Sequence, residues 1–187
     1  MNKAIFLILL LAFTASFVSG QKSKTSQTEN NHLLMATAWY QKSAEMRAIY
    51  YQTYYLAKLA LETKLSKHDS RPHPAVVLDI DETVLDNSPF EVNCITTGQS
   101  YSPDFWKSWT NKASAKALPG AIDFLRFACD KGCEIFYISN RTKEEMELTI
   151  KNMNMLEFPF ADEQHILLRT ETSDKTERRK MVDRKST

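Results

Sequence analysis

The stretch that decides the fold is Ala75-Val-Val-Leu-Asp-Ile-Asp-Glu-Thr-Val-Leu-Asp86, an apolar run that ends in a group of carboxylates. A short unbroken apolar run is typical of a strand buried on both faces of a parallel sheet. Asp79 and Asp81 are two residues apart, and in extended backbone this spacing points both side chains to the same side. Open α/β sheets bind ligands beyond the carboxyl ends of their strands, so we expect a functional site at Asp79 and Asp81.

The two carboxylates predict both a cation and a type of chemistry. Like charges held close together are costly unless they are compensated, and Mg²⁺ prefers oxygen ligands, so Asp79 and Asp81 are candidate metal ligands. The pair also suits phosphoryl transfer, in which Asp79 attacks phosphorus while Asp81 protonates the leaving alkoxide and then deprotonates the hydrolytic water. An arbitrary Asp-x-Asp is more often a turn or a helix cap, but the strand before it and Thr83 after it favour catalysis.

At these residues the chain resembles the haloacid dehalogenase (HAD) superfamily, whose first motif has the form Asp-x-Asp-x-Thr. The string Leu78-Asp-Ile-Asp-Glu-Thr-Val-Leu-Asp-Asn87 is similar to that of a narrower group, the class C acid phosphatases and 5′-nucleotidases of the outer-membrane lipoprotein e type. The resemblance spans roughly residues 39–179. It implies an α/β fold with a Rossmann-like (HAD-like) three-layer parallel sheet, an N-terminal helical segment and a cap insertion.

Two further motifs of the same family match positions downstream. A β-rich run ends at Ser139, and Ser139 and Asn140, within Ile138-Ser-Asn-Arg141, resemble the second motif, whose hydroxyl hydrogen-bonds the transferring phosphoryl group. Lys175 follows a third strand-like run at residues 164–169 and matches the third motif, whose ammonium steadies the nucleophile and the phosphate. The resemblance therefore implies that Ser139, Asn140 and Lys175 bind phosphate. A solvated surface lysine is the alternative for Lys175.

The region before the catalytic stretch predicts one long helix or a broken pair. Residues 33–65 contain no glycine or proline, and five of the seven tyrosines lie there. Uncharged side chains recur at helical spacing, which indicates a face packed on a core rather than an aromatic cofactor site. The members of this stripe are Met35, Trp39, Met46, Ile49, Thr53, Leu56 and Ala60.

Two shorter helices are predicted downstream. Residues 118–132 have a proline near the start and a glycine at the end, which is the usual placement of these residues in a helix. Thr142-Lys-Glu-Glu145 has the spacing of a capping box and predicts a helix that runs to about Asn154.

Residues from about 87 to 117 are predicted to be a cap insertion over the carboxylates. The segment carries turn signals at Ser88-Pro89 and Ser102-Pro103 and several large aromatic side chains. In the resembling family this region shapes the substrate pocket, so Trp106 and Trp109 are candidates for stacking on a nucleobase or an aromatic leaving group. Packing of the insertion on the body of the domain is an equal alternative for these two residues.

The N-terminus predicts export. Residues 1–3 give a positive start, residues 4–13 a short apolar core, and residues 18–20 small side chains for cleavage, so we interpret residues 1–20 as a secretory signal peptide. A retained membrane anchor is the alternative, although the apolar run is short for a bilayer. Residues 21–31 are polar and are predicted to be a tether. We expect a periplasmic, outer-membrane-associated or secreted protein, with association with a membrane surface left open.

Composition limits the number of domains, the kinds of partner and the number of disulfides. A chain of 187 residues with 43% hydrophobic residues and a net charge of +1 fits one domain, residues 32–187, and gives no electrostatic case for binding a nucleic acid polymer. The three cysteines allow at most one internal disulfide. Cys129 and Cys133 could pair, but buried thiols are equally compatible with the spacing. The oligomeric state stays open.

The sequence departs from the family pattern in its fourth motif. The fourth HAD motif, an acidic loop of the form Gly-Asp-Asn-x-x-x-Asp, should follow the helix after Lys175, whereas the sequence stops at Thr187. We therefore expect an incomplete, C-terminally truncated domain with the last strand or strands missing. Such a domain would lack an oxygen ligand for Mg²⁺, so we expect weak metal binding and low turnover.

The resulting prediction is an exported Mg²⁺-dependent acid phosphatase that hydrolyses phosphomonoesters, with nucleoside 5′-phosphates as candidate substrates, through an aspartyl-phosphate intermediate. The alternative from another class is a non-catalytic surface protein that uses the same fold for ligand binding or storage. A phosphomutase would also use paired aspartates, but the predicted signal peptide argues against it.

Overall fold

The computed structural model describes residues 31–67 and 74–185. The predicted signal peptide lies outside these residues, as does the predicted tether up to residue 30.

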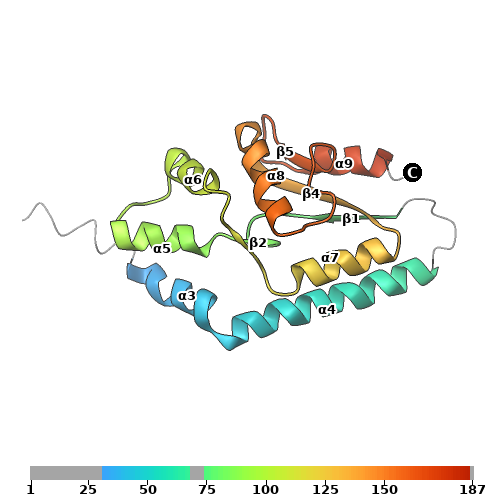
Figure 1. Cartoon of the computed structure of the whole chain (residues 1–187), viewed down its shortest axis with the longest axis horizontal. Helices are drawn as coiled ribbons and strands as arrows, with labels where there is room; N and C mark the ends of the chain where they lie inside the picture. The colour runs from blue at the N-terminus through green and yellow to red at the C-terminus, as the bar shows by residue number, and fades with distance from the viewer. Residues whose placement is uncertain (1–30, 68–73, 186–187) are drawn as a thin grey trace, which may run out of the picture.

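A three-stranded parallel sheet with the order β1-β4-β5 forms the centre of the fold (Figure 1). The strands are β1 (Ala75–Leu78), β4 (Glu134–Thr142) and β5 (Ile166–Arg169). All three predicted strands are thereby confirmed. The middle strand β4 is buried from Ile135 to Arg141 apart from Asn140, because it has a neighbouring strand on each side and helices on both faces.

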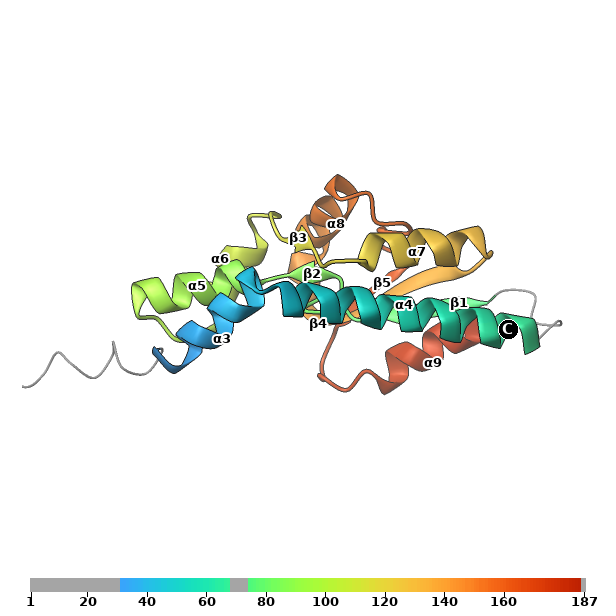
Figure 2. The ribbon, with the colours of Figure 1, turned by 90° about the horizontal axis from the view of Figure 1, so that it is seen from below.

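Helices cover both faces of the sheet and confirm the predicted three layers (Figure 2). Ile135 and Tyr137 of β4 pack in the main core with α7 (Ala121–Asp130) and α8 (Met146–Met155). Phe136 and Ile138, which alternate with them, pack on the opposite face with Val182 of α9 (Thr176–Lys185). The alternation of side chains along a strand is what divides one apolar run between two layers.

The capping box predicted at Thr142 is present. Thr142 and Glu145 exchange hydrogen bonds at the start of a 3₁₀ turn, η1 (Lys143–Glu145), which leads into α8. The helix predicted at residues 118–132 is confirmed as α7. Gly120 at its N-cap has φ +82°, a conformation that favours glycine, and an added Cβ would also lie in tight contact, 3.3 Å from ring atoms of Tyr51 and Tyr54.

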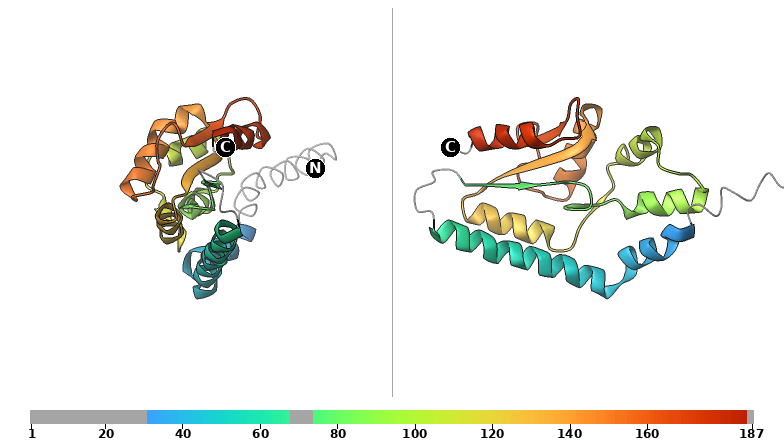
Figure 3. Two further views of the ribbon diagram at one scale, coloured as in Figure 1. Left: turned by 90° about the vertical axis from the view of Figure 1, so that its right-hand side faces the viewer. Right: turned by 180° about the vertical axis from the view of Figure 1, so that it is seen from behind.

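The N-terminal segment forms the broken pair of helices, α3 (Asn31–Lys42) and α4 (Ala44–Lys67), and α4 runs beside α7 along the molecule (Figure 3). Ser43 lies at the break, and its hydroxyl accepts a hydrogen bond from the Met46 amide, which caps α4.

The predicted packing stripe on these helices is wrong apart from Met46. Met35, Trp39, Ile49 and Leu56 are exposed. The face that packs carries Met46, Tyr54 and the partly buried Tyr50, Ala57, Leu61 and Leu65. Both stripes have helical period and lack charge. Tyrosine is buried here because its ring can pack while its hydroxyl reaches a backbone carbonyl.

The cap insertion contains two helices, α5 (Ser88–Thr97) and α6 (Pro103–Thr110), which extend beyond the carboxyl end of β1 (Figure 1). A short antiparallel pair, β2 (Leu85–Asp86) and β3 (Lys116–Ala117), joins the two ends of the insertion. The Ser-Pro signals mark helix starts, and the hydroxyl of Ser102 accepts a hydrogen bond from the Phe105 amide.

None of the three cysteines forms a disulfide; Cys94 and Cys133 are buried, and Cys129 is partly buried. Within the described residues, no helix is both long and apolar enough to span a membrane.

Candidate active site

Asp79 and Asp81 lie in the loop that follows β1, at the carboxyl end of the sheet. The loop folds back on itself, because the amides of Val84 and Leu85 both donate to the Ile80 carbonyl at 2.9 Å. Ile80 is fully buried and anchors the loop in the core.

Helix α4 holds the same loop from the outside. The Tyr50 hydroxyl donates to the Glu82 carbonyl at 2.8 Å, and the Tyr54 hydroxyl donates to the Thr83 carbonyl at 2.5 Å. Burial raises the pKa of Tyr54 well above its ordinary value, so its hydroxyl remains a neutral donor. Glu82 has φ +54°, a conformation that an L-residue adopts only when its surroundings hold it there.

The Asp79 carboxylate is open to solvent and has a cationic partner. Its side chain is 42% exposed, and Lys175 Nζ lies 2.5 Å from Oδ2. The Ile80 amide donates to the other oxygen, Oδ1, at 2.8 Å. Lys175 comes from the loop between β5 and α9, so the structure brings the predicted third-motif lysine to the predicted nucleophile.

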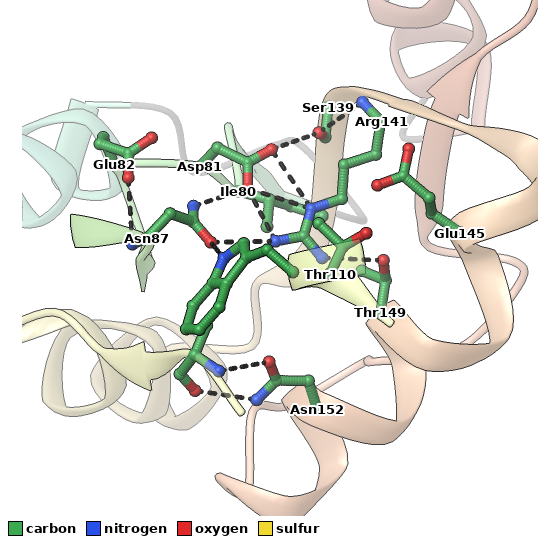
Figure 4. Close-up of polar contacts among 12 residues, drawn as sticks. Ile80, Asp81, Glu82, Asn87, Thr110, Ser139, Arg141, Glu145, Thr149 and Asn152 are labelled. Carbon is green, nitrogen blue, oxygen red and sulfur yellow. Dashed lines mark hydrogen bonds and ion pairs between the residues drawn. The ribbon is translucent and has the colours of Figure 1, made fainter. Parts of the chain in front are cut away.

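The Asp81 carboxylate is more enclosed, with a side chain 21% exposed, and both of its oxygens are engaged (Figure 4). Ser139 Oγ donates to Oδ2 at 3.0 Å. Arg141 donates to Oδ1 through Nε at 3.0 Å and Nη2 at 2.8 Å, and Asn87 Nδ2 donates to the same oxygen at 2.9 Å. A planar guanidinium fixes a carboxylate through two donors, so the position of Asp81 is tightly defined.

Arg141 and Asn87 are the main site residues that sequence reasoning missed. The Arg141 side chain is 2% exposed, and its Nη1 donates to Thr149 Oγ1 at 3.1 Å. Asn87 Oδ1 accepts from the indole of Trp109 at 2.9 Å, which connects the cap to Asp81 through one buried amide. Both residues stand inside the two family-like strings, which was the only signal in the sequence that could have indicated them.

The structure contradicts a stacking role for Trp109. Its ring belongs to the buried core, and its indole N–H is used by Asn87. Trp106, in contrast, lines an open cavity and packs edge-on against Phe90 at 5.1 Å between ring centroids. Spacing along one short helix could not tell which of the two rings faces inward.

Asn140 and Ser139 are joined to α9. The exposed Asn140 accepts from Arg178 Nη2 at 2.8 Å, and the buried Arg178 also donates through Nη1 to the Ser139 carbonyl at 2.5 Å. The Asn140 side chain thus turns toward Arg178, a residue that the sequence analysis did not single out.

A cavity of about 630 Å³ lies between the cap and the end of β4. Asp81 and Arg141 are at its wall, and the cap contributes an aromatic side made of Phe90, Tyr101 and Trp106. Asp79, Ser139 and Lys175 do not line it, so the cavity opens on the Asp81 side of the site.

The expectation that Asp79 and Asp81 hold one cation stays a prediction. In the structure Arg141 pairs with Asp81 and Lys175 pairs with Asp79, so each carboxylate has a cationic side chain beside it. In residues 31–67 and 74–185, no group of three or more His, Cys, Asp or Glu side chains is arranged to hold a metal ion. Asp79, with its exposed carboxylate, is the better hard-oxygen ligand of the two.

Known proteins resemble this chain in sequence and in fold. A family model described as HAD superfamily, subfamily IIIB (Acid phosphatase), matches residues 11–187. The structure of the class C acid phosphatase from Bacillus anthracis is 44% identical, with a TM-score of 0.81 over 87% of this chain and 67% of that chain. The same enzyme with tungstate bound matches at 44% identity and a TM-score of 0.81, over 85% of this chain and 67% of that chain.

Proposed function

The chain belongs to the acid phosphatases of HAD subfamily IIIB, and on that premise we propose that it hydrolyses phosphomonoesters through an aspartyl-phosphate formed on Asp79. The observation that carries this proposal is the different setting of two carboxylates on one short loop. Asp79 is exposed and paired with Lys175, whereas Asp81 is enclosed and fixed by Ser139 and Arg141.

A nucleophile must reach phosphorus, and Asp79 is the carboxylate that solvent and substrate can reach. Lys175 lies where its charge would offset the repulsion between an anionic carboxylate and an anionic phosphate. The Ser139 hydroxyl, at the end of β4, would turn from Asp81 to a phosphate oxygen when substrate binds.

Asp81 is positioned for proton transfer. It would give a proton to the leaving oxygen as the bond between that oxygen and phosphorus breaks, and would then take a proton from the water that cleaves the aspartyl-phosphate. Arg141 and Asn87 hold the carboxylate still between these steps. The leaving group would occupy the aromatic-walled cavity that opens beside Asp81.

Mg²⁺ is the cation that we propose for the site. The Asp79 carboxylate and the main-chain carbonyl of Asp81 would hold it, since oxygen donors suit a hard cation. When bound, it would neutralise charge on the transferring phosphoryl group.

Nucleoside 5′-phosphates are the proposed substrates. Phe90, Tyr101 and Trp106, whose rings all contact one another, form an aromatic wall of the cavity on which a flat base could stack. We also propose export, supported by the charge and apolar pattern of residues 1–20.

The test is phosphoenzyme formation by the full chain, incubated with ³²P-labelled p-nitrophenyl phosphate and millimolar Mg²⁺ and quenched in acid. We expect the label on Asp79 by mass spectrometry and no labelling of Asp79→Asn, because an amide is a poor nucleophile. Asp81→Asn should still become labelled, since p-nitrophenolate leaves without a proton, and should release the label more slowly. Labelling of Asp79→Asn at the wild-type level would rule out this mechanism.

A further inference from the structure

Trp109 belongs to the cap helix α6, yet its indole is tied to the catalytic loop. The residue is buried, and its indole N–H donates to Asn87 Oδ1 at 2.9 Å. Asn87 is buried as well and donates in turn through Nδ2 to Asp81 Oδ1 at 2.9 Å (Figure 4). Two hydrogen bonds in series therefore lead from the cap to the carboxylate that we assign to proton transfer.

The indole determines which way the Asn87 amide is turned. An indole N–H can only donate, so the amide must present its oxygen to Trp109, and its NH₂ group is left to face Asp81. Arg141 Nη2 is the other donor near the amide oxygen, but at 3.5 Å it is too distant to hold the amide by itself. With Trp109 in place, Asn87 gives a hydrogen bond to Asp81 and cannot accept one from it.

The two oxygens of Asp81 differ in what their partners can do. Oδ1 receives three N–H donors, one from Asn87 and two from Nε and Nη2 of Arg141, which leaves no acceptor for a proton on this oxygen. Oδ2 has the Ser139 hydroxyl at 3.0 Å and Arg141 Nε at the longer distance of 3.3 Å. A hydroxyl can accept as well as donate, so Oδ2 is the oxygen on which a proton fits.

We propose that Trp109 is a positioning residue that keeps Asn87 a donor to Oδ1 of Asp81, so that Oδ2 carries the proton for the leaving group. The proton passes from Oδ2 to the leaving oxygen as the bond between that oxygen and phosphorus breaks, and Asp81 is left as a carboxylate. Without the indole N–H, the amide can turn its oxygen to Asp81 and hold the proton in a hydrogen bond of its own. This inference rests on the proposed phosphatase function, since it concerns the acid step of that reaction.

The test compares two leaving groups in the full chain at millimolar Mg²⁺. Benzyl phosphate needs a proton on its leaving oxygen, whereas p-nitrophenolate leaves without one. In Trp109→Phe we expect kcat/KM to fall about 10-fold for benzyl phosphate and no more than about 2-fold for p-nitrophenyl phosphate, because general acid catalysis contributes on the order of 100-fold or more. A purely structural defect would lower both values alike, and their ratio does not depend on the fraction of folded protein.

Two further variants separate the donor from the size of the ring. Benzothienylalanine at position 109 keeps the shape of the indole but replaces its N–H by sulfur, and it should change the ratio in the same way. In an Asn87→Ala background, Trp109→Phe should change the ratio no further, since Trp109 acts through Asn87. Trp39→Phe is the matched control, because it removes an exposed indole N–H that donates to Glu45, and it should keep the wild-type ratio.

A second readout needs no turnover. The side-chain N–H protons of Asn87, identified in NMR spectra by their loss in Asn87→Ala, should exchange with water about 10-fold faster in Trp109→Phe than in wild type, since one hydrogen bond that fixes the amide is lost. Equal exchange rates would overturn the inference, as would an unchanged ratio of kcat/KM. An unchanged ratio with phosphoenzyme on Asp79 would leave the proposed function standing. Absence of phosphoenzyme from wild type would overturn the proposed function, whereas the exchange rates test the orientation of Asn87 independently.

Discussion

The two aspartates of the catalytic loop are alike in chemistry and only two residues apart, yet the fold treats them in opposite ways. The Asp79 carboxylate has one cationic partner and a side chain 42% exposed. The Asp81 carboxylate has three side-chain partners and a side chain 21% exposed. One is left accessible and the other is fixed.

This difference shows how neighbouring identical residues acquire different roles. The nucleophile needs access, and its ion pair is with a flexible lysine that can move to a phosphate. The proton-transfer residue, Asp81, needs a fixed position. Its ion pair is with the rigid guanidinium of Arg141, which is itself anchored by Thr149. The first two predictions below test whether the two ion pairs differ in the way this comparison requires, and the third tests the carboxyl group that follows Asp81 in the chain.

The largest effect is expected from Arg141→Met. The variant leaves Asp81 beside an apolar side chain and Thr149 without its donor. Removing one partner of an enclosed ion pair typically costs about 3–5 kcal/mol. Urea unfolding should show this loss in the free energy of unfolding. A loss below about 1 kcal/mol would mean that the Arg141 pair is no more structural than a surface pair.

An intermediate effect is expected from Lys175→Met, and on ligand binding rather than on stability. The Lys175 pair is partly exposed, so its loss should change the free energy of unfolding by only about 0–1 kcal/mol. Tungstate, which a similar enzyme binds in its crystal structure, should lose about 10-fold or more in affinity, because a charge-assisted contact is removed. Calorimetric titration of wild type and variant with tungstate measures this affinity. Unchanged tungstate affinity would separate Lys175 from the phosphate site.

The smallest effect concerns Glu82, which follows Asp81 in the chain. Burial of its carboxyl group, and next the charges of Asp81 and Asp86, raise its pKa from 4.5 to about 7, although the residue as a whole is exposed. The folded state therefore binds a proton more tightly than the unfolded state between these values, and stability should fall as the pH rises from about 4.5 to 7.

Glu82→Gln should lose this pH dependence. Relative to wild type, the variant should be more stable at pH 8 than at pH 5, by urea unfolding at both values. If the free energies of unfolding of variant and wild type differed by the same amount at pH 5 and pH 8, the pKa of Glu82 would not be raised in the folded protein.

The sequence was sufficient for the sheet and for the two catalytic candidates because buried strands and the motif have strong local signals. Asp79 and Lys175 are far apart in the sequence, and only the family resemblance brought them together beforehand. The Arg141 and Asn87 contacts to Asp81 depend on how the loop after β1, the start of α5 and the end of β4 meet, which no local pattern encodes. The prediction of the packed helical face was wrong for a similar reason. Two uncharged faces of α4 have the same period, and the choice between them depends on backbone carbonyls at Glu82 and Thr83 that only the folded loop presents.

The rates at which the buried cysteines react with an alkylating reagent should report how often different parts of the protein open. Cys94 lies in α5 of the cap insertion, and Cys133 lies directly before β4 in the body. Burial raises the pKa of both thiols, so each should react with an alkylating reagent only while its surroundings are open. The ratio of the two labelling rates therefore compares cap opening with unfolding of the body, and a ligand that closes the cap should slow the first rate alone.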